Sequence, residues 1–128
     1  EYVMSEGSYD VVMCERGIRT FANHARNTMD LSVVPVVHRM THLPIIVDPS
    51  HATGHNYMVA PLARAGVAVG ADGLIIEVHP RPAEALCDGA QALTLAQYRD
   101  LVEQLNAIRE VTVEATRGTT LYAESFAR

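Results

Sequence analysis

Three short apolar runs constrain the fold of this chain more than any other feature of the sequence. They occupy residues 10–17, 43–51 and 72–80, and each holds four or five apolar residues. None of them alternates strictly between apolar and polar residues. This pattern is typical of strands that are covered on both faces, as in a parallel sheet.

Helical signals follow each run. Ser32 is a candidate N-cap with Pro35 in the first turn, where the missing N–H costs little. Segment 55–69 carries apolar residues at helical spacing, and Thr94 with Gln97 forms a capping-box pattern before another amphipathic segment. The order βαβαβα, with a repeat of roughly 30 residues, predicts parallel α/β units.

Two architectures fit this order: an open doubly wound sheet, or part of a (β/α)8 TIM barrel. Each run ends in charged or polar residues, namely Glu15, Arg16, Asp48, His51, Glu77 and His79. In a barrel, catalytic residues lie at the carboxyl ends of the strands, where these side chains would share one opening. A complete barrel needs about 250 residues, so this chain predicts either an open three-stranded layer or part of a larger barrel.

Composition and charge exclude several classes of protein. The net charge is −5, and all ten basic residues are arginine, which argues against a nucleic-acid-binding surface. No apolar run approaches the roughly 18–20 residues of a membrane span, and the start of the sequence has no signal-peptide pattern. We therefore expect a cytoplasmic protein in which Cys14 and Cys87 are reduced thiols, with Cys14 as a small buried hydrophobe.

His51, Glu77 and Asp88 are the candidate metal ligands. They offer one imidazole nitrogen and two carboxylates from three separate loops or strand ends. This mixture suits Mn, Fe, Co or Zn better than Mg or Ca. The alternative is structural: His51 caps the next helix, Glu77 forms a buried salt bridge and Asp88 belongs to an Asp-Gly turn.

Arg16 and Arg19 are candidate anion-binding residues, because a guanidinium can bind phosphate or carboxylate through two parallel hydrogen bonds. Arg16 lies at a strand end, where such a contact is available. The alternative is an internal ion pair between Glu15 and an arginine. His79 is a further candidate, since residues two apart in a strand share a face and His79 therefore accompanies Glu77.

Four segments together resemble one enzyme family. "CERGIRTF", "VDPSHATG", "GADGLIIEVHP" and "ALCDGAQAL" resemble the C-terminal half of 3-deoxy-D-arabino-heptulosonate 7-phosphate (DAHP) synthase of the type I beta class. The resemblance covers roughly residues 1–108, in order and with the family's spacing. It implies the last three β/α units of a (β/α)8 barrel in residues 1–110, followed by a tail of uncertain structure in 111–128.

The resemblance also implies a reaction. The family condenses phosphoenolpyruvate with erythrose 4-phosphate to give DAHP and phosphate, at the entry to the shikimate pathway to aromatic amino acids. His51, Glu77 and Asp88 match three of its metal ligands, and Arg16 matches the arginine that binds the phosphate of phosphoenolpyruvate. The implied metal is Mn²⁺ foremost, with Fe²⁺, Co²⁺ or Zn²⁺ as alternatives.

Asp48 and His79 are expected to orient ligands or substrate, so that His51 and Asp48 form the implied catalytic pair while Arg16 and His79 bind substrate. The family's ligand cysteine in "GPC" and its "KPRTS" phosphate loop have no match here, and Cys14 is not that cysteine. We therefore expect a piece of a longer enzyme that is inactive alone and a homo-oligomer when full length.

Two alternatives remain at this point. The first is a non-catalytic α/β binding module that retains the motifs. The second is another metal-dependent barrel aldolase or lyase, such as 3-deoxy-manno-octulosonate 8-phosphate synthase, whose family shares the fold but is less similar in the four segments.

Overall fold

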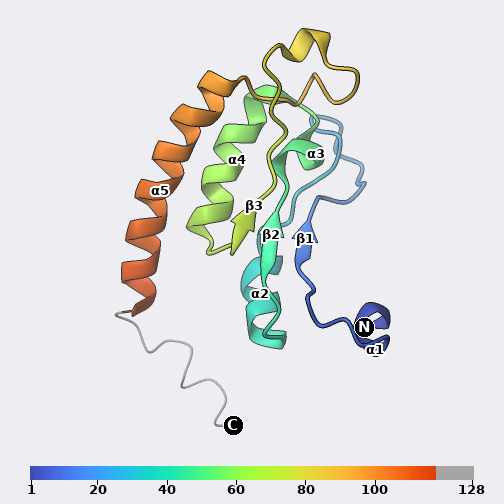
Figure 1. The fold of residues 1–128 in the computed structure, drawn as a ribbon, viewed down its shortest axis with the longest axis vertical. Helices are drawn as coiled ribbons and strands as arrows, with labels where there is room; N and C mark the ends of the chain where they lie inside the picture. The colour runs from blue at the N-terminus through green and yellow to red at the C-terminus, as the bar shows by residue number, and fades with distance from the viewer. Residues whose placement is uncertain (118–128) are drawn as a thin grey trace.

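The computed structural model describes residues 1–117 of the chain. In chain order the elements are α1 (Tyr2–Ser5), β1 (Met13–Glu15), α2 (Val33–Met40), β2 (Ile45–Val47), α3 (Pro49–Thr53), α4 (Asn56–Ala68), β3 (Gly73–Leu74), the 3-10 turn η1 (Pro82–Glu84) and α5 (Leu95–Arg117). The three strands form one sheet in the order β1-β2-β3 (Figure 1). Both pairs are parallel, which confirms the predicted parallel strands.

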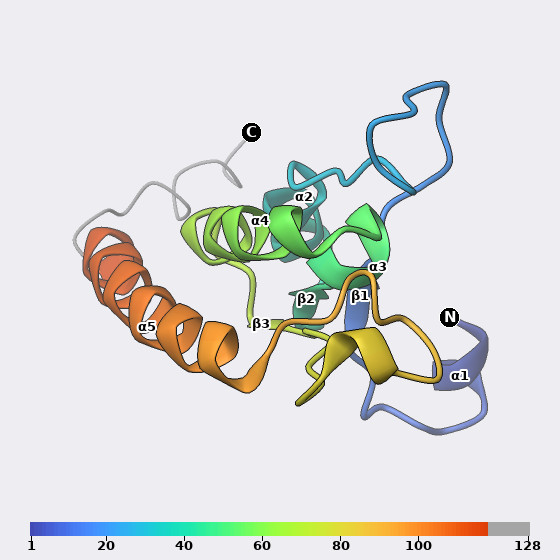
Figure 2. The same ribbon diagram turned by 90° about the horizontal axis from the view of Figure 1, so that it is seen from above.

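The connections between the strands place α2 and α4 on the same side of the sheet (Figure 2). Sequential strand order with helices on one side is the arrangement of neighbouring units in a barrel, because each right-handed crossover returns over the same face. A doubly wound sheet would instead carry helices on both faces. The barrel is therefore the better of the two predicted architectures.

The buried core lies between the central strand and these helices. Ile45 and Val47 of β2 are 2% and 0% exposed and pack against Val34 and Val37 of α2. A second cluster joins α4 to the start of α5 and consists of Val59, Ala63, Leu93 and Leu101. An added Cβ at Gly66 of α4 would lie 3.3 Å from Leu74 Cδ2 and 3.5 Å from Val47 Cβ, so glycine lets this helix pack close to the sheet.

Two of the predicted helix ends are confirmed. The Thr94 N–H donates to Gln97 Oε1 at 2.8 Å and the Gln97 N–H donates to Thr94 Oγ1 at 3.2 Å, which is the predicted capping box. Helix α4 ends before Gly70, whose φ of +97° suits glycine.

Ser32 occupies the N-cap position of α2, as predicted, but its side chain makes no cap hydrogen bond. Ser32 does precede α2, but its own φ of −67° and ψ of −19° are helical, whereas a capping residue normally has extended backbone. Its hydroxyl hydrogen-bonds to Asp30 Oδ1 instead.

The expectation that Cys14 is buried is also wrong. Cys14 is exposed and its neighbour Met13 is 39% exposed. Both lie on β1, which pairs with β2 alone within the described residues and forms an edge of this sheet. A strand at a sheet edge lacks the neighbours that a central strand has.

Strand β3 is shorter than its apolar run suggested. The Ile75 N–H still donates to Val47 O at 2.9 Å, but β2 ends there because Pro49 begins α3. Residues after Ile75 therefore lose their strand neighbour on that side.

Helix α5 runs through the domain boundary predicted at residue 110 and continues to Arg117. The remainder of the predicted tail, 118–128, lies outside the described residues. None of the described helices combines the length and the hydrophobicity needed to cross a membrane.

Asp72 fastens the amino end of β2 to α2, and we predict that Asp72→Asn lowers the free energy of unfolding by about 0.5–1 kcal/mol. Asp72 Oδ2 accepts from the Ile45 N–H at 2.8 Å and hydrogen-bonds to His38 Nε2 at 2.9 Å. Burial raises the pKa of Asp72, but these hydrogen bonds lower it more, so the pKa lies below its ordinary 3.8. The effect is small because the Asp72 side chain is 43% exposed.

The stabilisation by Asp72 should be complete above the unfolded pKa near 3.8 and should disappear as the pH falls through the lower folded pKa. Urea unfolding of both proteins at several pH values measures this difference. Asp100→Asn is the control, because Asp100 is 66% exposed and pairs with Arg99 on the surface of α5. A difference between wild type and Asp72→Asn that grows as the pH falls below 3.8 would contradict the assignment.

Candidate metal centre

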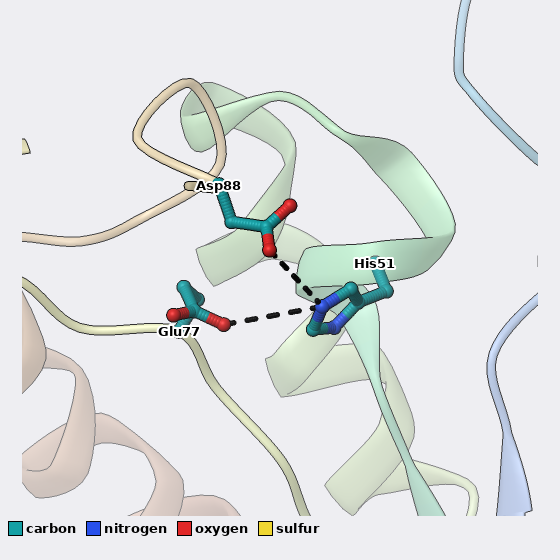
Figure 3. A group of neighbouring side chains, drawn as sticks. All are labelled: His51, Glu77 and Asp88. Carbon is teal, nitrogen blue, oxygen red and sulfur yellow. Dashed lines mark ion pairs between the residues drawn. The ribbon is translucent and has the colours of Figure 1, made fainter. Parts of the chain in front are cut away.

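The charged residues that follow the strands meet at one end of the sheet, as expected for carboxyl ends of parallel strands. His51 lies on α3, directly after β2, Glu77 follows β3, and Asp88 lies in the loop after η1. Figure 3 shows the three side chains pointing toward one another. Segments far apart in the sequence thus contribute to one cluster.

His51 Nε2 is the centre of this cluster. It lies 4.0 Å from Glu77 Oε2 and 3.8 Å from Asp88 Oδ2. One ligand atom from each residue lies within 4.8 Å of the other two. All three side chains are partly exposed, at 26%, 35% and 31%, so an ion could reach them from solvent.

A single turn of helix fixes the position of His51. Asp48 caps α3 by accepting from the His51 N–H at 3.0 Å, and Pro49 occupies the first turn. The turn ends at Gly54, which has a φ of +70° and donates its N–H to Ser50 O at 2.9 Å. The alternative in which His51 is a helix cap is therefore wrong, since His51 lies inside α3.

Glu77 is held against α3 by its backbone. Its N–H donates to Ser50 Oγ at 2.9 Å, and its carbonyl accepts from the Leu93 N–H at 2.9 Å. Because its side chain is 35% exposed, the alternative of a buried salt bridge is wrong. The Glu77 carboxylate oxygen Oε2 lies 4.0 Å from His51 Nε2.

Asp88 lies in a tight loop that glycine makes possible. Its φ of +55° is left-handed, which Asp tolerates better than most residues. A Cβ added to the next residue, Gly89, would lie 2.3 Å from Pro82 O, so only glycine fits there. The predicted Asp-Gly turn is present, and it carries the carboxylate into the cluster.

Asp48 connects the cluster to Arg16. It is 1% exposed, and its Oδ2 lies 2.9 Å from His51 Nδ1 and 3.1 Å from Arg16 Nε. The alternative pairing of Glu15 with an arginine is wrong. Glu15 Oε1 instead accepts from the backbone N–H groups of Gly17, at 2.8 Å, and Asp30, at 3.1 Å.

A second cation, Arg26, was not singled out from the sequence. Arg26 Nη1 lies 3.8 Å from Asp88 Oδ1. A Cβ at Gly54 would lie 2.9 Å from Arg26 Nε, so the absence of a side chain there leaves room for the guanidinium. Arg26 lies outside any strand or helix, in a loop with no periodic pattern, so only the fold reveals its position. Arg19 supports the same loop by donating from Nη1 to Arg26 O at 2.6 Å.

His79 and Cys14 lie outside the cluster of potential ligand atoms. His79 Nδ1 accepts from the Arg81 N–H at 3.1 Å, so the neutral ring carries its proton on Nε2. Although Cys14 is exposed, partial desolvation raises the pKa of its thiol, and the charge of Asp48 raises this pKa further. The thiol is thus kept protonated, which disfavours Cys14 as a thiolate ligand.

A cavity of about 400 Å³ lies between the loop after β1 and α4. Its wall includes Met29, Tyr57, Met58, Pro61 and Leu62. None of the three clustered residues lines this mainly apolar cavity, so it is separate from the candidate metal centre.

Comparison with known proteins identifies the family. Residues 1–114 match the family model described as the DAHP synthetase I family. The chain is 47% identical over 110 residues to the phospho-2-dehydro-3-deoxyheptonate aldolase of Thermotoga maritima, which covers 86% of this chain and 32% of that protein. The chain therefore spans about a third of the length of this relative.

A crystal structure of that Thermotoga maritima protein, also described as DAHP synthase, matches with a TM-score of 0.84 and 46% identity over 86% of this chain and 32% of that chain. A truncated form of the Thermotoga maritima synthase matches with the same TM-score, over 42% of its chain. These matches confirm the predicted portion of a TIM barrel.

A second group of relatives is less similar. The 2-dehydro-3-deoxyphosphooctonate aldolase of Desulfosudis oleivorans is 34% identical over 125 residues, covering 89% of this chain and 44% of that protein. The family model covers most of the chain and the identity is higher to the heptonate enzyme. The chain therefore belongs to the DAHP synthetase I family.

Proposed function

We propose that this chain supplies the metal-binding and part of the phosphate-binding site of a DAHP synthase, which condenses phosphoenolpyruvate with erythrose 4-phosphate. The observation that carries the proposal is the approach of Glu77 and Asp88 to His51 Nε2, at 4.0 and 3.8 Å. Similarity to the Thermotoga maritima enzyme supports the choice of reaction. We further propose a homo-oligomer in the cytoplasm, as the resemblance implies.

The residues fit a divalent ion. One imidazole nitrogen and two carboxylate oxygens are the mixed donors that Mn²⁺, Fe²⁺, Co²⁺ and Zn²⁺ accept, and we favour Mn²⁺. His51 Nδ1 is engaged by Asp48 at 2.9 Å, which leaves the Nε2 lone pair for the ion. When bound, the ion would supply Lewis-acid polarisation of the aldehyde oxygen of erythrose 4-phosphate.

Arg16 is the proposed phosphate-binding residue for phosphoenolpyruvate. Its Nε forms an ion pair with Asp48, while the side chain as a whole is 54% exposed. The two terminal nitrogens can therefore present parallel donors to two phosphate oxygens. Binding at this position would offset the charge of the phosphate and orient the substrate beside the metal centre.

The remaining residues have proposed roles in orientation. His79 carries its proton on Nε2 when the ring is neutral, and this N–H is a donor for a substrate oxygen.

In the proposed reaction C3 of phosphoenolpyruvate bonds to the aldehyde carbon, water adds at C2, and cleavage of the C2–O bond releases inorganic phosphate. Asp48 orients His51 and so acts on the reaction indirectly.

The octulosonate aldolases are the alternative for substrate class, because several are 34–38% identical to this chain. The 47% identity to the heptonate enzyme favours the first reaction. A non-catalytic binding module does not need clustered metal ligands beside an oriented arginine. Their combination therefore favours an enzyme over such a module.

The metal centre predicts that Co²⁺ binds to the 128-residue chain in a manner that depends on the three clustered residues. His51→Ala, Glu77→Gln and Asp88→Asn should each lower Co²⁺ affinity by about 100-fold or more, beyond the usual 10–100-fold effect of residues that only support a ligand. Titration of the Co²⁺ absorption bands measures this affinity. Asp100→Asn is the matched control, and equal affinity in all five proteins would contradict the site.

Activity can be tested by completing the barrel. We expect that a chimera in which residues 1–114 replace the matching third of the Thermotoga maritima enzyme forms DAHP from phosphoenolpyruvate and erythrose 4-phosphate. Arg16→Met in the chimera should raise the KM for phosphoenolpyruvate by about tenfold or more, because a charge-assisted bidentate contact is lost. Enzyme assays with both sugar phosphates measure reaction and substrate class.

The 128-residue chain alone should form no DAHP, because by resemblance one metal ligand and much of both phosphate sites lie elsewhere in the barrel. A folded, metal-binding chimera that forms no DAHP would contradict the proposed reaction. DAHP formation by the isolated chain would contradict the inference that a further metal ligand and further phosphate-binding residues are required for the reaction.

A further inference from the structure

Asp48 is a buried carboxylate that contacts both halves of the proposed site, namely the metal half, which contains His51, and the phosphate half, which contains Arg16. Its side chain is 1% exposed, whereas the side chains of His51 and Arg16 are 26% and 54% exposed. Two hydrogen bonds and one ion pair surround it: Asp48 hydrogen-bonds to the His51 N–H at 3.0 Å and to His51 Nδ1 at 2.9 Å, and Arg16 Nε lies 3.1 Å from Oδ2 in an ion pair. The two partner residues come from the ends of different strands, β1 and β2.

Both oxygens of Asp48 are needed for these contacts. Oδ1 accepts from the His51 backbone, and Oδ2 faces both His51 Nδ1 and Arg16 Nε. An amide of the same shape has only one oxygen, so in either orientation its NH₂ group would face an N–H donor. A buried donor that faces another donor is left without a partner, which is unfavourable.

We propose that Asp48 is a positioning residue that links the two halves of the site: its one carboxylate orients both the imidazole for the metal and the guanidinium for the substrate phosphate. This inference rests on the proposed function for the roles of His51 and Arg16. A ligand that moves either partner changes the contact that Asp48 can make with the other, which is a hydrogen bond for His51 and an ion pair for Arg16. Binding in one half is thereby communicated to the other half, and such coupling is reciprocal.

The sheet contains a matched comparison. Asp72 also binds a histidine, His38, and a strand backbone N–H, but it lies at the amino end of β2. Asp72 has neither His51 nor Arg16 as a partner. Asp72→Asn therefore removes a similar Asp–His contact at the opposite end of the sheet without disturbing the proposed link.

The test uses the 128-residue chain labelled with ¹⁵N, with Zn²⁺ alone and inorganic phosphate alone as probes. Nitrogen resonances of the His51 ring and the Nε–H resonance of Arg16 report on the two halves separately. In the wild type we expect Zn²⁺ to shift Arg16 Nε–H and phosphate to shift the His51 ring nitrogens. In Asp48→Asn both of these cross-site shifts should disappear, and Zn²⁺ affinity should fall by about 10–100-fold.

Asp72→Asn should retain both cross-site shifts and the wild-type affinities. Asp48→Asn that keeps its fold, its affinities and its cross-site shifts would overturn the proposal. If Asp48→Asn does not fold, Arg16→Met decides, because this exposed side chain can be replaced without burying a new group. The His51 ring resonances of Arg16→Met should then differ from those of the wild type in the absence of any ligand, because Asp48 has lost its second partner, and unchanged resonances would overturn the proposal.

Failure of the proposed function gives a different result. His51→Ala and Arg16→Met should abolish Zn²⁺ binding and phosphate binding, respectively, if the two halves have the proposed roles. If neither variant alters binding, the site itself is wrong. If both do and Asp48→Asn changes nothing, the roles of His51 and Arg16 hold and the link through Asp48 is wrong.

Discussion

The parallel pairing of β2 with both of its neighbours is the constraint on which the rest of the structure depends. Glu15 pairs with Val47, and Val47 pairs with Leu74, so the three strands end at nearly the same level. Whatever residue follows each strand is delivered to one end of the sheet. The buried, apolar Ile45 and Val47 fix this register, because a slip by one residue would turn them away from α2.

Much of this arrangement could be predicted from the sequence because it rests on local signals. Apolar runs without alternation indicated the three strands, and Thr94 with Gln97 indicated the start of α5. The approach of His51 and Glu77 followed from their position after these strands, whereas Asp88 was matched to the same site by the family resemblance. The interpretations that failed concern tertiary contacts. The exposure of Cys14 depends on which strands lie beside β1, and the arginine next to Glu15 in the sequence pairs with Asp48 instead.

Loop geometry explains why other features could not be predicted. Arg26 reaches Asp88 because Gly54 lacks a side chain, and Asp88 takes its position because Gly89 fits beside Pro82 O. These are close approaches between distant segments, and a sequence pattern contains no distance between them. Similarly, β3 ends where β2 turns into α3, so its length depends on a neighbouring strand rather than on its own apolar residues.

The distribution of charge gives the site its chemical character. Asp48, Glu77 and Asp88 bring three carboxylates near His51, and Arg16 and Arg26 bring two guanidiniums to Asp48 and Asp88. Without an ion the carboxylates are in excess, so a divalent cation is attracted. With an ion bound the balance becomes positive, which favours a phosphate substrate. Asp48 is buried and contacts both the Arg16 guanidinium and the His51 imidazole. A change of charge at the metal site therefore acts on the phosphate-binding arginine through Asp48.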